Sequence, residues 1–343
     1  MIPGKTILVT GAGGSIGSAL VKALARSDPH ALILLDHSEH NLYRIQLALS
    51  AMPGCVGPIP ILGDICDSAL VAEVIERYRP EVIYHSAAFK HVPLMEANPL
   101  AAIRNNALGT FTLARAAAEQ KTPKLIMIST DKAVNPEGVM GASKRVAELI
   151  LTRFNTTQTQ MKAIRLGNVL DSEGSVVPLF REQISRGGPV TVTHPDATRY
   201  FLTMSQAVEM VLAMDNLEEE GSIFVPVMGD PVTILDLARR LIEEAGLRPG
   251  EDVPIVFTGL RPGDKMTEDL ISENEFLEPT TDPRLYRVGA LRGLPDGFDA
   301  MISELMEGLC SRDVATLLEI VSGLVPEYRP SDFLVESLNR SPA

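Results

Sequence analysis

Apolar and polar residues alternate along the first 170 residues with two different periods. Short, nearly continuous apolar runs predict six buried strands: Thr6–Thr10, Ala31–Leu35, Ile59–Leu62, Val82–Tyr84, Leu125–Ile128 and Ala163–Leu166. Between these runs, apolar residues recur at helical spacing and predict five helices: Ile16–Ala25, Asn41–Ser50, Ser68–Tyr78, Pro99–Glu119 and Pro136–Phe154. Strands that alternate with helices favour an α/β fold, a Rossmann-like doubly wound parallel sheet with helices on both faces.

Two of these helices are expected to begin at an Asn-Pro pair. Asn98-Pro99 and Asn135-Pro136 each place an N-cap residue before a proline that needs no backbone donor. We therefore predict sharp helix starts at both pairs.

The pattern changes after Asn168, where segments become shorter and Pro and Gly more frequent. Four further helices are predicted: Ser205–Leu217, Ile234–Ala245, Asp264–Leu270 and Asp313–Val321. We expect residues 1–170 to form the sheet domain and residues 171–343 a smaller C-terminal region, with the chain crossing back between the two.

Composition narrows the class of protein. The 343 residues are 45% hydrophobic and 22% charged, and the net charge of −13 argues against a nucleic-acid partner. The three cysteines form neither a disulfide framework nor a metal-ligand spacing, so no metal site is predicted. The longest uncharged stretch, residues 45–63, holds too many prolines and glycines for a membrane helix. A cytoplasmic protein without a membrane span is expected.

A glycine-rich turn follows the first predicted strand. Gly11, Gly14 and Gly17 have the spacing Gly-x-x-Gly-x-x-Gly between a strand and a helix, where a backbone without side chains can approach a pyrophosphate. Asp36 ends the second strand, where an acidic residue holds the adenosine ribose. The predicted dinucleotide site comprises Gly11, Gly14, Ser15, Ile16, Gly17 and Asp36.

The residues around Asp36 favour NAD over NADP. A carboxylate repels a 2′-phosphate, and residues 37–40 offer no arginine to receive one. After the third strand, Asp64 and Ile65 either border the adenine or form only a turn and a helix cap.

Several further stretches carry a resemblance to a known family. They are Tyr84–Pro93, Ser129–Pro136, Met140–Arg145, Arg165–Val169, Thr198–Phe201, Arg261–Lys265 and Val325–Tyr328. With the glycine spacing, they resemble the extended short-chain dehydrogenase/reductases. In particular, they resemble the UDP-N-acetylglucosamine 4,6-dehydratases of bacterial polysaccharide biosynthesis. The resemblance covers nearly the whole chain.

Two departures from that family affect the expected activity. Many members carry a membrane-embedded N-terminal part, so this chain resembles their catalytic domain alone. The family's usual Tyr-x-x-x-Lys is here Met140 and Lys144, which resembles the branch that retains the configuration at C5. Inversion at C5 stays open, because short members usually carry the tyrosine.

The resemblance implies a reaction in which hydride leaves C4 for NAD, water is eliminated across C5 and C6, and hydride returns to C6. It implies Lys132 as the base at C5 and Asp131 as the acid at the C6 hydroxyl. Because a thioether has no titrating proton, Met140 cannot replace the tyrosine as the base at C4. Thr130, or a water held by Thr130 and Lys144, is the candidate, and Lys144 is expected at the nicotinamide ribose.

Further residues are candidates for binding the cofactor or the substrate. Ala87, Ala88, Lys90 and Asn106 are expected near the cofactor, with Asn105 leaving the register open by one residue. The side chains expected to contact the UDP part of a UDP-sugar substrate are Lys90, Asn168, Arg199 and Arg261. The helices Pro99–Glu119 and Pro136–Phe154 are apolar enough to form a homo-oligomer face, in a dimer or a larger assembly.

Two other functions compete with the dehydratase hypothesis. A UDP-sugar 4-epimerase uses the same C4 oxidation but needs no base at C5, so Asp131 and Lys132 argue against it. A non-catalytic NAD- or nucleotide-sugar-binding protein would explain the missing tyrosine.

Overall fold

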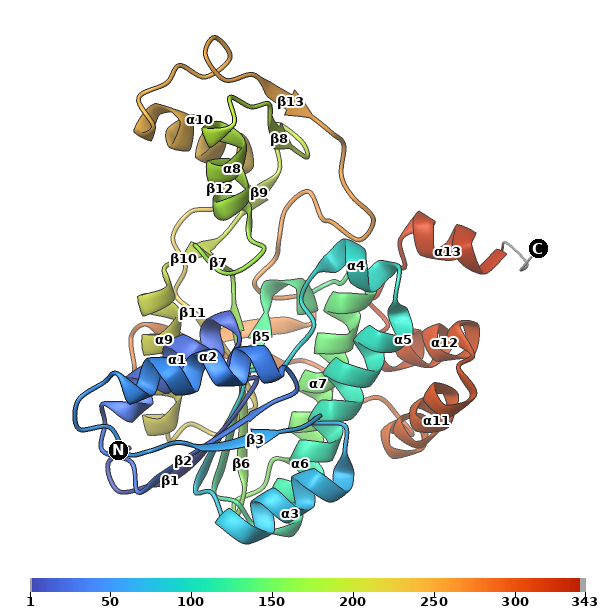
Figure 1. The fold of residues 1–343 in the computed structure, drawn as a ribbon. Coiled ribbons are helices and arrows are strands. Elements are labelled where there is room, and N and C mark those ends of the chain that lie inside the picture. The colour runs from blue at the N-terminus through green and yellow to red at the C-terminus, as the bar shows by residue number, and fades with distance from the viewer. Residues whose placement is uncertain (1, 340–343) are drawn as a thin grey trace.

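A nine-stranded sheet forms the centre of the computed structural model, which describes residues 2–339 (Figure 1). The strand order is β14-β15-β11-β6-β5-β4-β1-β2-β3. The strands are β1 (Thr6–Thr10), β2 (Ala31–Asp36), β3 (Ile59–Leu62), β4 (Val82–His85), β5 (Lys124–Thr130), β6 (Gln160–Leu166), β11 (Ile223–Pro226), β14 (Glu275–Pro279) and β15 (Leu285–Ala290). Strands β1 to β6 and β11 are parallel, whereas β15 and β14 are antiparallel. The predicted Rossmann-like parallel sheet is therefore confirmed, and three later strands extend it.

Both faces of the sheet are buried under helices. Ile7 and Val9 belong to the apolar cluster on one face, and Leu8 between them belongs to the cluster on the other. The first face is covered by α1 (Ser15–Ala25), α2 (Glu39–Ser50) and α9 (Met204–Ala213). The second face is covered by α3 (Ser68–Tyr78), α6 (Gly109–Glu119) and α7 (Val139–Phe154). Burial on two sides explains why these strands have continuous apolar sequences.

The outer side of α7 carries a C-terminal helix pair, α11 (Phe298–Ser311) and α12 (Val314–Leu324). Leu317 and Val321 of α12 share one buried cluster with Val146 and Ile150 of α7. The apolar face that suggested an oligomer contact is thus partly covered by the same chain.

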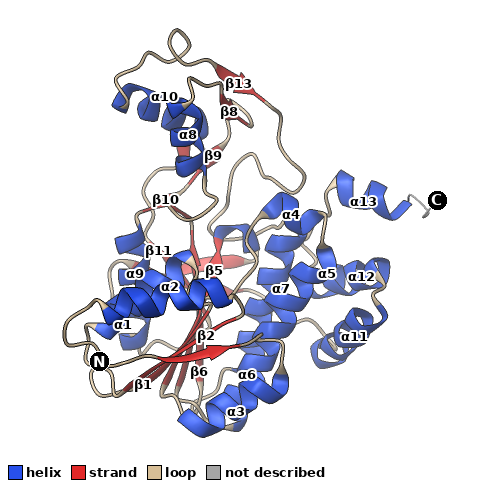
Figure 2. Ribbon diagram, in the orientation of Figure 1, coloured by secondary structure: helices blue, strands red, loops and turns tan. Residues whose placement is uncertain are grey.

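A smaller lobe stands above the carboxyl ends of the sheet strands (Figure 2). Its own apolar cluster lies among α8, α10, β8 and β13. The lobe elements and short bridging strands are β7 (Asn168–Val169), α8 (Val176–Ser185), β8 (Val190–Val192), β9 (Thr198–Arg199), β10 (Phe201–Leu202), β12 (Val232–Thr233), α10 (Ile234–Glu244) and β13 (Ile255–Phe257). Two short helices lie beside the start of α7, α4 (Val92–Glu96) and α5 (Pro99–Ala102), and α13 (Asp332–Asn339) ends the described chain.

The predicted helix Asp264–Leu270 is wrong. The carbonyl of Met266 accepts a hydrogen bond from the backbone N–H of Thr198 at 3.0 Å, and the carbonyl of Lys265 accepts one from the Arg199 guanidinium at 2.8 Å. These carbonyls accept hydrogen bonds from β9, so they are not available for the hydrogen bonds of a helical turn, and the segment is irregular.

Two other predicted helices differ from the observed ones. Helix α7 begins at Val139, not at Pro136, because its N-cap is Gly138, whose backbone is extended with a φ of −141° and a ψ of 155°. Asn135 has a φ of +40° and its side chain donates to Asp269. The predicted helix Pro99–Glu119 is divided into α5, a π-helix over Ile103–Leu108, and α6.

Within residues 2–339, none of the helices combines the length and the apolar character that crossing a membrane requires.

Candidate active site

A cavity of about 520 Å³ opens at the carboxyl ends of the parallel strands, under the smaller lobe. This is where open α/β sheets bind their ligands. The predicted site residues on its wall are Gly14, Ser15, Ile16, Ala88, Lys90, Thr130, Lys132, Met140, Lys144, Asn168, Arg199 and Arg261. The structure therefore brings residues from four sheet connections and from the lobe to one place.

The glycine turn after β1 allows two close backbone approaches. A Cβ on Gly11, whose φ is +63°, would lie 2.6 Å from the backbone nitrogen of Ala87. A Cβ on Gly17 would lie 2.0 Å from the carbonyl oxygen of Gly11. Helix α1 starts just beyond, with Gly14 as its N-cap and no side-chain cap. Its first N–H groups thus point toward the cavity, a favourable position for an anion.

Asp36 lies beside this turn and is 5% exposed. Its carboxylate accepts hydrogen bonds from the backbone N–H groups of Gly13 at 2.8 Å and Ser38 at 2.9 Å. A second, smaller cavity of about 150 Å³ is lined by Asp36 together with Gly63 and Ile65. The predicted ribose residue therefore faces a cavity next to the glycine turn.

Asp64 does not line that smaller cavity. Its carboxylate accepts from the backbone N–H of Cys66 at 2.8 Å and from Arg104 at 2.9 Å. Burial raises the pKa of this carboxyl, but the two donors outweigh burial and the pKa lies below its ordinary value. Asp64 thus forms a turn and an ion pair, while Ile65 borders the cavity.

The two neighbouring asparagines have different places. Asn106 holds the backbone of Phe89 through two hydrogen bonds, of 2.8 and 3.0 Å, and donates to the Ser143 hydroxyl at 3.0 Å. It lines neither cavity, whereas Asn105 lines the smaller one. The π-helix that contains both inserts an extra residue into the turn, which is why helical spacing could not assign the register.

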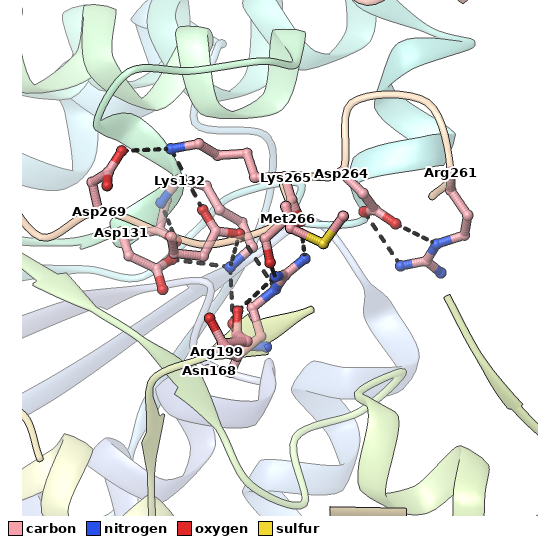
Figure 3. Close-up of polar contacts among 12 residues, drawn as sticks. Asp131, Lys132, Asn168, Arg199, Arg261, Asp264, Lys265, Met266 and Asp269 are labelled. Atoms are coloured by element: carbon pink, nitrogen blue, oxygen red, sulfur yellow. Dashed lines mark hydrogen bonds and ion pairs between the residues drawn. The ribbon is translucent and has the colours of Figure 1, made fainter. Parts of the chain in front are cut away.

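Lys132 is the centre of the polar cluster above β5 (Figure 3). Its ammonium donates to Asn168 at 2.8 Å and to Asp131 at 3.0 Å, and it lies 3.4 Å from Glu268. Burial lowers the pKa of Lys132, but the carboxylates of Asp131 and Glu268 outweigh it and raise the pKa above the ordinary value. Lys132 is therefore a charged ammonium here, whereas the base expected at C5 must be a neutral amine.

Asp131 is fully buried behind Lys132. One carboxylate oxygen accepts from the Thr130 hydroxyl at 3.0 Å, and the other has no hydrogen-bond partner among the described residues. Thr130 lies on the cavity wall, so it stands between the cavity and Asp131.

The two predicted arginines are engaged differently. Arg199 is 8% exposed and donates to the carbonyls of Met266 and Lys265 at 3.1 and 2.8 Å. Arg261 pairs with Asp264 at 2.8 Å and keeps 59% of its side chain exposed, apart from the Lys132 cluster (Figure 3). Arg261 is thus the more available cation of the two.

Met140 and Lys144 lie one turn apart on α7, and both line the cavity while being almost fully buried. The Lys144 ammonium has no hydrogen bond or ion pair with another described residue. Burial lowers its pKa to about 8, against the opposing charge of Glu148. His85 lies behind it, its ring bonded to Thr10 and Thr110, and burial together with Lys144 lowers its pKa to about 3. His85 is a neutral packing residue.

A buried ion network that sequence reasoning missed supports α7. Glu148 accepts from the Ser129 hydroxyl at 2.7 Å and from Arg165 at 2.8 and 3.0 Å. Arg165, fully buried on β6, also donates to Glu275 of β14 at 2.8 and 2.9 Å. The network fixes the helix that carries Met140 to the sheet.

A loop from the lobe crosses the opening of the cavity. The Lys90 ammonium donates to the carbonyl of Glu173 at 2.7 Å, and the N–H of Glu173 donates to the Ser15 hydroxyl at 3.0 Å. The loop leads into α8, whose N-cap Ser175 makes no side-chain cap bond and also lines the cavity. Two uncapped helix starts therefore face one cavity.

The fold and this site define a short-chain dehydrogenase/reductase that is related to nucleotide-sugar dehydratases and epimerases. The chain matches the polysaccharide biosynthesis protein family over residues 7–290 and belongs to that family. Among solved structures, it resembles Pen from Bacillus thuringiensis, with a TM-score of 0.76, 28% identity, and coverage of 85% of this chain and 89% of that one.

Relatives include the capsular polysaccharide biosynthesis protein CapD of Staphylococcus aureus, 46% identical over 88% of this chain. The probable polysaccharide biosynthesis protein EpsC of Bacillus subtilis is 45% identical over 85% of it. The chain spans about half of each relative, 51% of CapD and 49% of EpsC. A UDP-glucose 4-epimerase of Rickettsia rickettsii is 30% identical over 84% of both chains.

Proposed function

We propose that this chain is an NAD-dependent 4,6-dehydratase of a UDP-sugar, with UDP-N-acetylglucosamine as the first substrate to test. The observation that carries the proposal is the Thr130, Asp131 and Lys132 cluster. Thr130 and Lys132 present a hydroxyl and an amine on one wall of the cavity, and the buried Asp131 carboxylate lies behind them in contact with both. Dehydration needs a proton acceptor and a proton donor at neighbouring carbons, and this cluster offers both.

The residues present fit NAD. The uncapped start of α1 suits the pyrophosphate, and Asp36 in the smaller cavity suits the adenosine ribose and disfavours a 2′-phosphate. The Lys144 ammonium, free of other partners in the described chain, suits the nicotinamide ribose. When bound, NAD would take a hydride from C4 of the sugar and return it at C6.

A second helix start suits the substrate diphosphate. Helix α8 begins at the cavity, next to Lys90 and the exposed Arg261. These groups favour binding of an anionic UDP moiety. Arg199 instead donates to the backbone carbonyls of Lys265 and Met266 and holds the segment that contains them.

The hydrogen bonds support a route for the protons. The Thr130 hydroxyl donates to Asp131, so Thr130 can take the proton of the C4 hydroxyl while passing its own to Asp131. Asp131, now protonated, returns this proton through the Thr130 hydroxyl, and the C6 hydroxyl leaves with it as water. Lys132 takes the C5 proton and later returns it, and this requires the neutral amine.

Met140 bears on the stereochemistry. Its thioether cannot exchange protons, so the C4 proton is assigned to Thr130. Because methionine at this position resembles the configuration-retaining branch of the dehydratases, we propose that C5 keeps its configuration. NMR of the product formed in deuterated water tests this, and an inverted C5 would contradict it.

A UDP-sugar 4-epimerase is the second candidate, favoured by the similarity to the Rickettsia protein. Mass measurement after incubation with UDP-N-acetylglucosamine separates the two, because dehydration removes one water and epimerisation leaves the mass unchanged. Lys132→Ala should abolish the loss of water, while Lys22→Ala, an exposed lysine on α1, should not change it. An unchanged mass with the wild-type protein would refute the dehydratase proposal.

A further inference from the structure

Glu268 contacts Lys132, although the proton route described above does not use it. Its side chain is 1% exposed, and Oε1 lies 3.4 Å from both Nζ of Lys132 and Nε of Arg199. The other oxygen, Oε2, is buried without a hydrogen-bond partner among the described residues, and Nζ of Lys265 is 4.0 Å away. An ionised carboxylate with one unsatisfied buried oxygen is costly, and protonation reduces that cost.

Four charged groups face Glu268 from three segments: Lys132 and Asp131 after β5, Arg199 on β9, and Lys265 on its own loop. Burial raises the pKa of the Glu268 carboxyl above its ordinary value, although Lys132 and Arg199 oppose this. The negative charge of Asp131 raises it further. Glu268 is thus a carboxyl that can hold a proton beside a lysine.

Lys132, in turn, must lose its ammonium proton before it can act as a base at C5. Its ammonium donates to Asn168 and Asp131 and forms an ion pair with Glu268, and a charged ammonium cannot accept a proton from C5. We propose that Glu268 accepts the Lys132 ammonium proton, which leaves Lys132 as the neutral amine that acts at C5 in the proposed dehydration. One proton moves from Nζ to Oε1, and the pair changes from ammonium and carboxylate to amine and carboxylic acid.

Binding of a substrate would favour this transfer. A bound sugar displaces water from the cavity, and a neutral pair loses less solvation than an ion pair. Glu268 acts through Lys132 and is a positioning residue, since it does not line the cavity. The inference rests on the proposed function, because only a base at C5 needs the neutral lysine.

The transfer predicts a characteristic pH profile. In the wild-type protein the pair keeps one proton in total, so kcat/KM for UDP-N-acetylglucosamine should be flat between about pH 6 and 7, where Lys144, with a pKa of about 8, also keeps its charge. In Glu268→Gln the lysine must lose its proton to solvent. At pH 7 we expect a loss of roughly 10²- to 10³-fold, and a rate that rises about tenfold per pH unit.

The experiment measures these profiles for the wild type, Glu268→Gln, Glu268→Asp and Asp269→Asn, with thermal unfolding as the check on folding. Glu268→Asp keeps a carboxyl and should stay flat at a lower rate. Asp269→Asn is the matched control, because Asp269 is the next acid along the chain and pairs with Lys265 instead. It should match the wild type.

A flat Glu268→Gln profile, at full or reduced rate, overturns the Glu268 inference, because a merely structural role would lower the rate equally at every pH. Sloped profiles for the wild type or for Glu268→Asp overturn it as well, and these decide the matter if Glu268→Gln does not fold. A wild-type protein that releases no water from UDP-N-acetylglucosamine refutes the proposed function and the inference together. Dehydration with a flat Glu268→Gln profile refutes the inference alone.

Discussion

Substituting Gly17 by alanine tests whether the turn after β1 is built for close backbone contact. The new methyl carbon would lie 2.0 Å from the carbonyl oxygen of Gly11 and 2.8 Å from the Ser86 hydroxyl oxygen. Even attractive carbon–oxygen contacts keep about 3.3 Å, so the start of α1 must move by more than about 1 Å relative to the turn. The first contact is with backbone, and no side-chain rotation can relieve it.

The size of the effect follows from that displacement. Overpacking of this kind costs roughly 1–3 kcal/mol of folding free energy. The helix start also loses its alignment with a bound pyrophosphate. Losing one or two hydrogen bonds to a charged group, at roughly 1.5–3 kcal/mol each, lowers NAD affinity by at least about tenfold.

The assay compares Gly17→Ala with Gly57→Ala. Gly57 has nothing within 4 Å of its added Cβ and lies outside the turn, so its substitution should change neither property. NAD content after purification, NAD affinity by calorimetry and the unfolding temperature are measured for both. A Gly17→Ala protein with wild-type NAD affinity and unfolding temperature would refute the close-contact reasoning.

Three further predictions follow from the buried charges. Arg165→Met removes the fully buried arginine that pairs with both Glu148 and Glu275 and leaves them the ion pairs with Arg145, so it should cost roughly 3–5 kcal/mol in urea unfolding; a loss below about 1 kcal/mol would contradict the network. Although burial opposes it, Arg165 helps to lower the pKa of Glu148 from 4.5 to about 2. Its ionisation therefore stabilises the fold above about pH 4.5, and this contribution is lost as the pH falls toward 2, which Glu148→Gln should abolish in stability–pH curves. Asp36→Ser should raise NADP affinity relative to NAD in binding titrations, and an unchanged ratio would contradict its assigned place.

The strands were predictable because burial on both faces imposes a local signal, a continuous apolar run that needs no knowledge of distant residues. The helices Pro99–Glu119 and Asp264–Leu270 were mispredicted for the opposite reason. In the first, a π-helix changes the register within an otherwise regular apolar pattern. In the second, Arg199 and Thr198 take up the carbonyls that a helix would use. Both depend on contacts that no window of sequence contains.

The candidate site likewise combines features with a local sequence signal and features that depend on distant residues. The glycine spacing and Asp36 are local signals in the sequence, and the structure places them around one turn beside the two cavities. The division of the chain near residue 170 and the roles of the site residues stay predictions.

The Asp131-Lys132 pair shows where the sequence alone stops being informative. The two adjacent residue types indicate an acid and a base, but which side chain carries the proton depends on the charges around both. Asn168 and Glu268 approach the lysine from segments that are 36 and about 136 residues further along the chain. They turn a residue expected to be a base into an ammonium with a neighbouring proton acceptor. The chemistry of the pair is therefore set by the segment that crosses the site from Arg261 to Glu268, and a change in that segment should alter the protonation of Lys132 without touching either adjacent residue.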